Sequence, residues 1–299
     1  MQGRLLQGVY VPLITPFAAD GSVARDAVER LAHEMLDAGC AGIVALGTTG
    51  ESAMLDADEQ AVVIDACSRV CVERGAQLIV GAGGNSTAKS VAAVQALRDT
   101  PALTAALVVV PYYVRPSEAG VVEHFRAVAA ASPVPVVVYN VPTRTGRDLG
   151  AAGMLELART SNVTGVKQAH DALDPATLQI LAEAPRTFSV LGGEDTVLFP
   201  LTLMGGAGTI SASAHLCTER FVAMIECGLA GKVDDGRVHA EALLPVVQAA
   251  FAEPNPMVFK GVLHAQGRIP TPDVRLPLVN ASPEAIERAL VAVDAASGH

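Results

Sequence analysis

Short apolar runs, each followed by a segment of helical periodicity, recur along most of this chain and restrict its fold more than any other feature. Continuous apolar runs are typical of parallel strands that are buried on both faces. Eight such strand–helix units predict an α/β protein with a single (β/α)8 barrel, because a doubly wound open sheet normally has fewer strands. The runs are Gly8–Ile14, Ala41–Leu46, Gln77–Gly81, Ala105–Val110, Val134–Tyr139, Val163–Lys167, Thr187–Leu191 and Gly208–Ser211.

The last part of the chain shows helical patterning without a further strand-like run. The segments are His215–Ala230, Asp235–Ala252, Pro256–Gln266 and Pro283–Ala295. We interpret the first as the eighth barrel helix and the others as a helical appendage. The predicted organisation is therefore a barrel over residues 1–230 and C-terminal helices over residues 231–299, packed together as one structural unit.

Composition and charge exclude several classes of protein. The chain of 299 residues is 51% hydrophobic and 17% charged, which indicates a large core and little disorder. A net charge of −10 without a cluster of Lys and Arg argues against a nucleic-acid partner. The longest nearly apolar run, Ala102–Val114, is shorter than the roughly 20 residues of a membrane span. Met1–Leu6 has no leader-like apolar stretch, so we expect a soluble cytoplasmic protein without membrane association.

The cysteines and histidines show no pattern of a disulfide framework or a metal centre. The five cysteines are Cys40, Cys67, Cys71, Cys217 and Cys227, an odd number without a CxxC motif. Cys67 and Cys71 lie one helical turn apart, which would suit a metal, but no further ligand follows at a suitable spacing. We predict buried thiols and no metal site.

Lys167 is the strongest candidate for a reactive group. Such groups project from the C-terminal ends of barrel strands, and Lys167 ends the sixth run. A lysine there is partly desolvated, which favours the neutral amine that attacks a carbonyl to form an imine. The alternative is a lysine that is salt-bridged or reaches the solvent. Of the other three lysines, Lys89 and Lys232 fall on polar stretches, and Lys260 lies on a predicted helix far from the strand ends.

Tyrosines are also scarce, and three of the four fall at predicted strand ends. These are Tyr112, Tyr113 and Tyr139, whereas Tyr10 lies inside the first run. A phenol can pass a proton to a carbinolamine or an aldehyde oxygen, and Thr48 would relay it. The alternative, that a tyrosine only packs in the core, applies best to Tyr10 and Tyr112.

Two groups suit the binding of carboxylates. Arg144 lies in a turn bounded by proline and glycine, which would hold its guanidinium group rigidly, although a surface arginine is the alternative. The backbone N–H groups of Thr48–Gly50 would form a nest for a second carboxylate. The glycine-rich segments 81–84 and 205–208 leave open a phosphate site at the end of the barrel, but they do not match GxGxxG.

Five motifs together resemble the dihydrodipicolinate synthase/N-acetylneuraminate lyase family of class I pyruvate aldolases. They follow the family's order and spacing through nearly the whole chain: Gly47–Ser52 (GTTGES), Pro111–Pro116 (PYYVRP), Tyr139–Gly146 (YNVPTRTG), Gly165–Lys167 (GVK) and Glu253–Pro256 (EPNP). The resemblance implies a (β/α)8 barrel with C-terminal helices, a homotetramer built as a dimer of tight dimers, and no cofactor. It is greatest to the synthases of the family, which condense pyruvate with L-aspartate 4-semialdehyde to 4-hydroxy-tetrahydrodipicolinate in lysine and diaminopimelate biosynthesis.

The resemblance also implies a role for each candidate residue. Lys167 would form the Schiff base with pyruvate, and Tyr139 would donate and accept protons at the imine. Thr48 and Tyr113 would complete a proton relay, with Tyr113 reaching across the tight-dimer interface. The implied substrate-binding residues are Thr48 and Thr49 for the pyruvate carboxylate, Arg144 for the semialdehyde carboxylate, and Gly193 and Ile210 for backbone contacts.

Two departures from the family pattern bear on regulation and substrate. Many bacterial members bind lysine as a feedback inhibitor with two His and one Glu, but those positions are here Ala57, Gln60 and Lys89. The other positions of that pattern fit, namely Ser52, Ala53, Asn85 and Tyr112. Because a cationic Lys89 would repel the lysine ammonium group, we predict weak or absent lysine inhibition. Gln168 stands where the synthases more often have Glu, which bears on the substrate.

Two other functions remain as alternatives. A sister lyase, such as an N-acetylneuraminate lyase or a 2-keto-3-deoxy sugar acid aldolase, would use Glu194 and Asp195 to bind substrate hydroxyls. Arg144 and the EPNP motif favour the synthase, because those relatives usually lack an arginine in this loop. A non-catalytic barrel that binds a small molecule is the third interpretation, and the presence of both Lys167 and Tyr139 argues against it.

Overall fold

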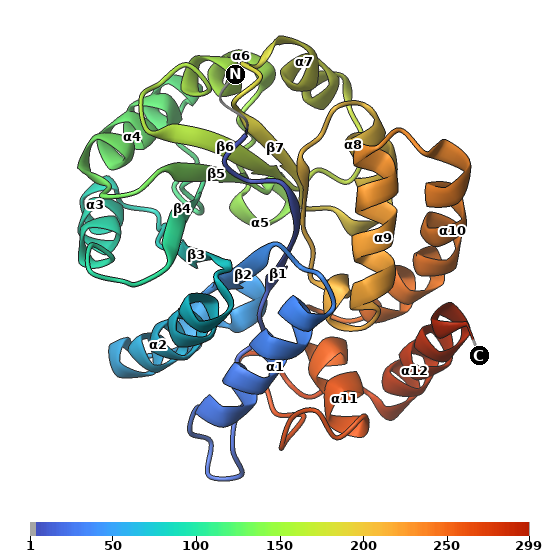
Figure 1. Cartoon of the computed structure of the whole chain (residues 1–299). Helices are drawn as coiled ribbons and strands as arrows, with labels where there is room; N and C mark the ends of the chain where they lie inside the picture. The colour runs from blue at the N-terminus through green and yellow to red at the C-terminus, as the bar shows by residue number, and fades with distance from the viewer. Residues whose placement is uncertain (1–3, 299) are drawn as a thin grey trace.

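The computed structural model describes residues 4–298, which form a closed barrel of eight parallel strands in chain order (Figure 1). The ring closes between β1 and β8, where Tyr10 is the register partner of Ile210. The predicted (β/α)8 fold is confirmed, and the strand bounds differ from the predicted ones by at most two residues. The strands are β1 (Gly8–Pro12), β2 (Gly42–Ala45), β3 (Gln77–Gly81), β4 (Leu103–Val109), β5 (Val136–Asn140), β6 (Val163–Gln168), β7 (Ser189–Gly192) and β8 (Gly208–Ile210).

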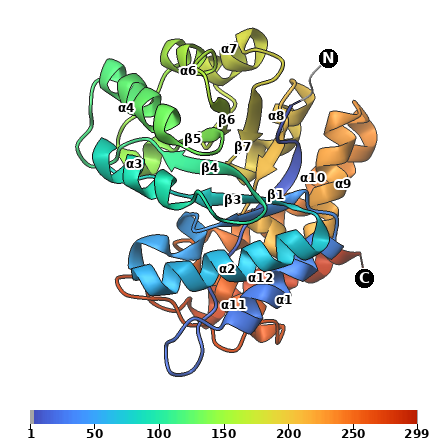
Figure 2. The ribbon, with the colours of Figure 1, turned by 60° about the vertical axis from the view of Figure 1, so that its left-hand side comes forward.

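Helices surround the barrel on its outer side, except the short α5 (Pro142–Thr145), which lies at the barrel mouth (Figures 1 and 2). Those up to the eighth strand are α1 (Arg25–Asp37), α2 (Ala57–Arg74), α3 (Thr87–Ala96), α4 (Glu118–Ala131), α5 (Pro142–Thr145), α6 (Ala151–Leu157), α7 (Pro175–Glu183) and α8 (Leu198–Leu203). Those after it are α9 (Thr218–Leu229), α10 (Val233–Ala250), α11 (Met257–Ala265) and α12 (Pro283–Ser297). In α1, Val28, Leu31 and Met35 recur at helical spacing and are buried against the barrel.

Side-chain capping fixes the starts of the helices that flank the barrel mouth. Asp56 accepts a hydrogen bond from the N–H of Glu59, and the Glu59 carboxylate accepts one from the N–H of Asp56, so a capping box begins α2. The Asp174 side chain caps α7 by accepting from the N–H of Thr177 at 2.7 Å. These caps fix where the loops between strand and helix end.

The core has two parts, one inside the barrel and one between strands and helices. The interior cluster includes Tyr10, Val44, Ile79, Tyr139 and Ile210. Tyr10 is completely buried, its hydroxyl donates to the Gln77 side chain, and burial raises its pKa to about 12. The core interpretation of Tyr10 therefore fits the structure.

The C-terminal helices return to the side of the barrel that carries α1. α10 packs on α9 and α12, and the segment after α11 reaches back to the start of the chain. There the Arg268 guanidinium group donates to Glu34 of α1 at 2.8 Å, and the Thr271 hydroxyl donates to the carbonyl of Phe17 at 2.8 Å. The division at residue 230 stays a prediction.

Two expectations concern the surroundings of the protein. Among residues 4–298, none of the helices is long and apolar enough to cross a membrane. Within the same range all five cysteines are unpaired, and burial raises the pKa of Cys71 to about 11. The expectation about a leader rests partly on Met1–Gly3, which lie outside the described residues.

Candidate active site

The predicted imine-forming residue, Lys167 in β6, lies next to Tyr139 in β5. The two residues are partners in the parallel register of these strands, so their side chains leave the barrel wall at the same level. The ammonium nitrogen of Lys167 lies 4.4 Å from the centre of the Tyr139 ring. Only 7% of Lys167 and 8% of Tyr139 is exposed. A buried amine in contact with a phenol is a pair that suits imine chemistry.

A cavity of about 520 Å³ opens beside this pair at the C-terminal ends of the strands. Its lining includes Thr48 from the β2–α2 loop, Tyr139, Arg144 from α5 and Asn255 from the segment before α11. Lys167 is not among the residues that line the cavity, but it contacts Tyr139, which is. The fold thus gathers most of the predicted polar groups at one end of the barrel.

The two threonines of the GTTGES motif lie in a 3-10 turn, η1 (Thr48–Gly50), directly after β2. Thr48 is exposed at the cavity, whereas Thr49 is buried. The N–H groups of Gly50 and Glu51 donate to carbonyls within this turn. The N–H groups of Thr48 and Thr49 remain to donate to a bound carboxylate. The predicted nest therefore has fewer donors than the sequence suggests, because the N–H of Gly50 is already engaged.

Asn255 is a site residue that sequence reasoning did not assign. Its side-chain amide donates to the Thr49 hydroxyl at 3.0 Å, across 206 positions of sequence. The signal was present in the EPNP motif, where two prolines flank Asn255 in a rigid turn. The motif does not indicate that Asn255 contacts Thr49, because that contact depends on the fold.

Gly193 directly follows β7 and Ile210 ends β8, so both lie at the C-terminal ends of their strands. A Cβ atom at Gly193 would lie 2.8 Å from Cε of Lys167, so only glycine lets the lysine chain pass. The N–H of Gly193 donates to the carbonyl of Gln168 at 2.8 Å. Ile210 belongs to the same interior cluster as Tyr139. Their backbone contacts to a substrate stay a prediction.

Tyr112 and Tyr113, predicted to follow the fourth strand, lie in the loop after β4. β4 ends at Val109, and Pro111, which has no N–H to donate, begins a loop where Tyr113 has a positive φ of 70°. Tyr112 lines the cavity, but Tyr113 is 86% exposed. Tyr113 therefore does not reach the cavity of its own chain, and its relay role stays a prediction.

Lys260 is not remote from the strand ends, so that expectation was wrong. The fold carries α11 back to the β2–α2 loop, where the Lys260 ammonium group donates to the Glu51 carboxylate and, at 2.8 Å, to the carbonyl of Asp273. Both side chains of the ion pair are completely buried, and the ammonium lies 3.9 Å from the centre of the Phe17 ring. Burial lowers the pKa of Lys260 to about 8, and the facing Glu51 carboxylate opposes that effect.

The acidic pair after β7 does not offer two carboxylates to the cavity. Asp195 is buried and accepts a hydrogen bond from the N–H of Ser213 at 2.9 Å. Burial raises the pKa of Asp195, while hydrogen bonds from Ser213 and Ser211 and the charge of Lys167 oppose this shift. Glu194 accepts from the Thr196 hydroxyl at 2.9 Å. This geometry does not support the hydroxyl-binding role considered for the pair.

The two glycine-rich segments lie at opposite ends of the barrel. Residues 81–83 line the cavity. Residues 205–207 precede β8, which begins at Gly208, at the N-terminal end of the strands, and the Arg4 guanidinium group donates to the carbonyl of Gly205 at 2.8 Å. The second segment therefore does not contribute to a phosphate site at the mouth.

A (β/α)8 barrel with a buried lysine and tyrosine in contact at its mouth is the arrangement of a class I lyase, an enzyme that binds a carbonyl substrate as an imine. The arginine on the same cavity adds a group for an anionic substrate.

Comparison with known proteins identifies the family. Residues 5–296 match the model of the Dihydrodipicolinate synthetase family. The 4-hydroxy-tetrahydrodipicolinate synthase of Moorella thermoacetica is 40% identical over 97% of both chains. The solved dihydrodipicolinate synthase from Thermotoga maritima has a TM-score of 0.93 at 31% identity, covering 98% of this chain and 99% of its own. A monomeric dihydrodipicolinate synthase variant has a TM-score of 0.92 at 30% identity, covering 98% and 97%. The chain belongs to the dihydrodipicolinate synthetase family, a family of class I lyases, and the resemblance is confirmed.

Proposed function

We propose that this enzyme condenses pyruvate with L-aspartate 4-semialdehyde to 4-hydroxy-tetrahydrodipicolinate, a step of lysine and diaminopimelate biosynthesis. The observation that carries the proposal is the contact between Lys167 and Tyr139 beside a cavity that Arg144 also lines. The name of the Moorella relative supports this choice of reaction.

The reaction would start at Lys167, whose neutral amine attacks the keto carbon of pyruvate and forms an imine with loss of water. The imine acidifies the neighbouring methyl group, and loss of a proton there gives an enamine. The enamine carbon attacks the aldehyde carbon of the semialdehyde, whose oxygen takes a proton. Attack of the semialdehyde's amino group on the imine carbon then closes the ring and frees Lys167.

The other residues would move protons and bind carboxylates. Tyr139, in contact with Lys167, is placed to donate protons to the oxygen atoms that develop at each step. Thr48 would relay protons with Tyr113 and, together with Thr49, would bind the pyruvate carboxylate. Arg144 would bind the semialdehyde carboxylate, and the backbone at Gly193 and Ile210 would contact the bound keto acid. No cofactor takes part in this proposal.

The reaction is tested by incubating the enzyme with pyruvate and a panel of aldehydes. We expect turnover with aspartate semialdehyde and none with N-acetylmannosamine or aldehydes derived from sugar acids. Turnover with the sugar-derived aldehydes alone would move the assignment to the sister lyases. A barrel that binds pyruvate without forming an imine would support the non-catalytic interpretation.

Replacing Arg144 with alanine is expected to raise KM for the semialdehyde by about 10- to 100-fold, because a charge-assisted contact with its carboxylate contributes about 1.5–3 kcal/mol. KM for pyruvate should change little, since Thr48 and Thr49 bind that carboxylate. Steady-state kinetics with each substrate varied in turn measures both values. R98A, at an exposed arginine just after α3, is the matched control. An equal rise in both KM values would contradict the assignment of Arg144.

We propose that the assembly is a dimer of tight dimers in which Tyr113 enters the neighbouring chain's site. The exposure of Tyr113, at 86%, and its positive φ support this proposal, since a large aromatic side chain held away from its own chain suits an interface.

We also propose that the enzyme acts in the cytoplasm, where the buried, unpaired thiols would stay reduced.

Lysine is expected to inhibit this enzyme weakly or not at all. Gln60 uses its side-chain amide to donate to the carbonyls of Ser52 and Leu55 at 3.1 and 3.2 Å, so it is already bound to the backbone. Lys89 is exposed on α3 and adds a positive charge where relatives have a carboxylate. Steady-state rates over increasing lysine concentration test this. An inhibition constant below about 1 mM, equivalent to binding by more than about 4 kcal/mol, would overturn it.

A further inference from the structure

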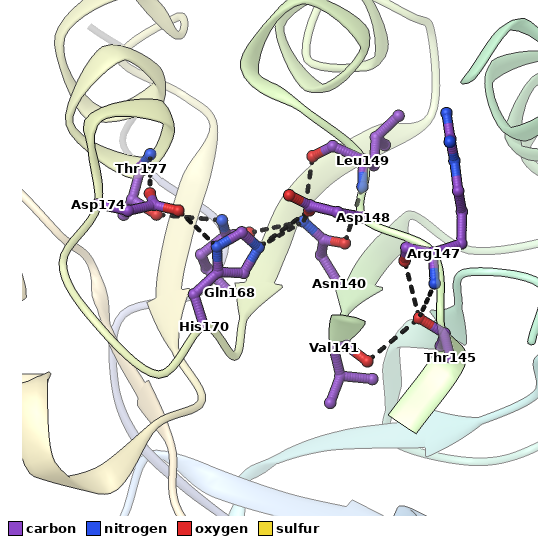
Figure 3. Close-up of polar contacts among 10 residues, drawn as sticks. All are labelled: Asn140, Val141, Thr145, Arg147, Asp148, Leu149, Gln168, His170, Asp174 and Thr177. Carbon is purple, nitrogen blue, oxygen red and sulfur yellow. Dashed lines mark hydrogen bonds and ion pairs between the residues drawn. The ribbon is translucent and has the colours of Figure 1, made fainter. Parts of the chain in front are cut away.

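A polar network lies next to the Lys167–Tyr139 pair and has no part in the mechanism above (Figure 3). At its centre is His170, in the loop that follows β6, with a side chain that is 9% exposed. The Nδ1 atom of its ring lies 2.7 Å from Oδ2 of Asp174, and the Nε2 atom lies 3.0 Å from Oδ1 of Asp148. One imidazole therefore bridges two carboxylates from two different loops.

The network is attached to the residues that directly follow the catalytic pair. Asn140 follows Tyr139 at the end of β5, and Gln168 follows Lys167 at the end of β6; both are buried. The Asn140 amide donates to Oε1 of Gln168 at 3.3 Å, which joins the two strand ends. The Gln168 amide donates to the Thr177 hydroxyl at 3.1 Å, which extends the network to the start of α7.

The same network closes the segment 141–149, which we call the Arg144 loop. Asn140 accepts from the N–H of Leu149 at 3.2 Å and donates to its carbonyl at 3.1 Å. The Asn140 amide also lies 3.1 Å from Oδ1 of Asp148, the atom that faces His170. The C-terminal end of the Arg144 loop is therefore held by Asn140 at the end of β5 and by His170 in the loop after β6.

The ring of His170 is held by partners from both neighbouring loops. In the part of the chain that is described, the charged groups in contact with the ring are Asp148 and Asp174. The Asn140 amide nitrogen lies 3.2 Å from Nε2 as well, so Nε2 faces both that amide and the Asp148 carboxylate. Partial burial works against ionisation of Asp174, but hydrogen bonds from Thr177 and His170 outweigh it, so its pKa lies below the usual range. The imidazole therefore ties the loop after β6 to the end of the Arg144 loop.

We propose that His170 is a positioning residue: it fixes the Arg144 loop against the Lys167 strand and thereby sets the affinity for the carboxylate of the second substrate. This inference rests on the proposed function, because it needs a substrate that Arg144 binds. Since the imine pair lies on β5 and β6 themselves, His170 should affect the second substrate and leave pyruvate capture unchanged.

The test compares KM for the semialdehyde with KM for pyruvate in the wild type, H170A and H170Q. We expect H170A to raise KM for the semialdehyde about tenfold, a loss of about 1.4 kcal/mol, with KM for pyruvate and borohydride trapping of pyruvate unchanged. H170Q keeps an amide that can still donate a hydrogen bond to one of the two carboxylates. Its KM for the semialdehyde should therefore lie between the values for H170A and the wild type.

H33A is the matched control, since His33 also faces a carboxylate, Glu73 at 3.8 Å, but lies on α1. It should keep both wild-type KM values. The proposal fails if H170A keeps the wild-type KM for the semialdehyde, or if KM for pyruvate rises equally. A wild type that captures pyruvate but does not turn over the semialdehyde would instead refute the proposed function, so the two failures are distinguishable.

Discussion

Replacing Lys167 with alanine is expected to abolish covalent capture of pyruvate and to lower kcat by at least about 1,000-fold. In the proposed mechanism the amine nitrogen of Lys167 joins the substrate, and alanine offers no group to replace it. The neighbouring Tyr139 would still be present, but a proton donor without an imine has nothing to act on. The effect should therefore be far larger than that of removing any one substrate-binding group.

Reduction with borohydride in the presence of pyruvate, followed by peptide mass spectrometry, measures the capture directly. The wild type should carry the reduced adduct on Lys167, and K167A should carry none. K167R separates charge from chemistry: it keeps a cation beside Tyr139 but lacks a neutral amine, so it should be as inactive as K167A. K89A, at an exposed lysine on α3, should retain full capture and full activity.

An adduct on Lys260 in the wild type would contradict this mechanism. The structure argues against that outcome, because the Lys260 ammonium is completely buried and donates to Glu51 and to a carbonyl. Its lowered pKa, about 8, by itself would have favoured a nucleophile. Geometry decides between the two lysines, since Lys167 is the one in contact with Tyr139 beside the cavity.

The barrel was predictable from sequence because its strands are signalled locally. Runs such as Val136–Val138 and Ile43–Ala45 are apolar on both faces, and parallel strands inside a ring of helices need that composition. Strand ends then locate the mouth, so Lys167 and Tyr139 followed from position alone. Their contact needed one further fact, the register of β5 against β6, which makes them partners.

The parts that sequence reasoning missed depend on contacts between distant segments. Asn255 meets Thr49 across 206 positions, and Lys260 meets Glu51 across 209. The sequence around one residue of each pair does not indicate the other residue, since each lies in a separate short motif. Lys260 even looked remote, because a helix after the last strand has no strand end of its own.

The relay role of Tyr113 stays a prediction for a different reason, because it depends on a neighbouring chain. Pro111 has no N–H to donate and follows the end of β4 at Val109, and Tyr113 has a positive φ of 70° in the loop that begins there. A residue that serves a neighbouring chain is exposed in its own, so exposure of Tyr113 does not exclude the relay role.

The second large effect concerns stability. Replacing Lys260 with methionine is expected to lower the free energy of unfolding by about 3–5 kcal/mol, because it leaves the Glu51 carboxylate buried without its counter-ion. Methionine is similar in length and apolar, so it leaves little cavity. Glu51 also accepts a hydrogen bond from the N–H of Arg275 at 2.8 Å, and this single neutral donor does not compensate a buried charge.

The measurement is urea unfolding followed by circular dichroism at one fixed protein concentration, since assembly adds to the apparent stability. The double variant E51Q/K260M is the decisive comparison. The neutral amide that E51Q introduces can still accept from the N–H of Arg275, and the pair then holds no buried charge. We expect the double variant to recover more than half of the loss in K260M, which would show strong coupling between the two positions.

Activity distinguishes a local from a global role for this ion pair. Glu51 has a positive φ of 56° and directly follows the turn that carries Thr48 and Thr49, so the charge that Lys260 neutralises lies at the base of the turn proposed to bind pyruvate. In folded K260M, we expect KM for pyruvate to rise. Borohydride trapping at saturating pyruvate should persist, because Lys167 is unchanged. An exposed ion pair contributes about 0–1 kcal/mol to stability. If the free energy of unfolding of K260M lies within about 1 kcal/mol of the wild-type value, the buried pair contributes no more than that. The attachment of the C-terminal helices to the barrel mouth would then rest on apolar packing, on Asn255, and on Arg275, whose guanidinium group donates to the Glu59 carboxylate at 2.6 Å.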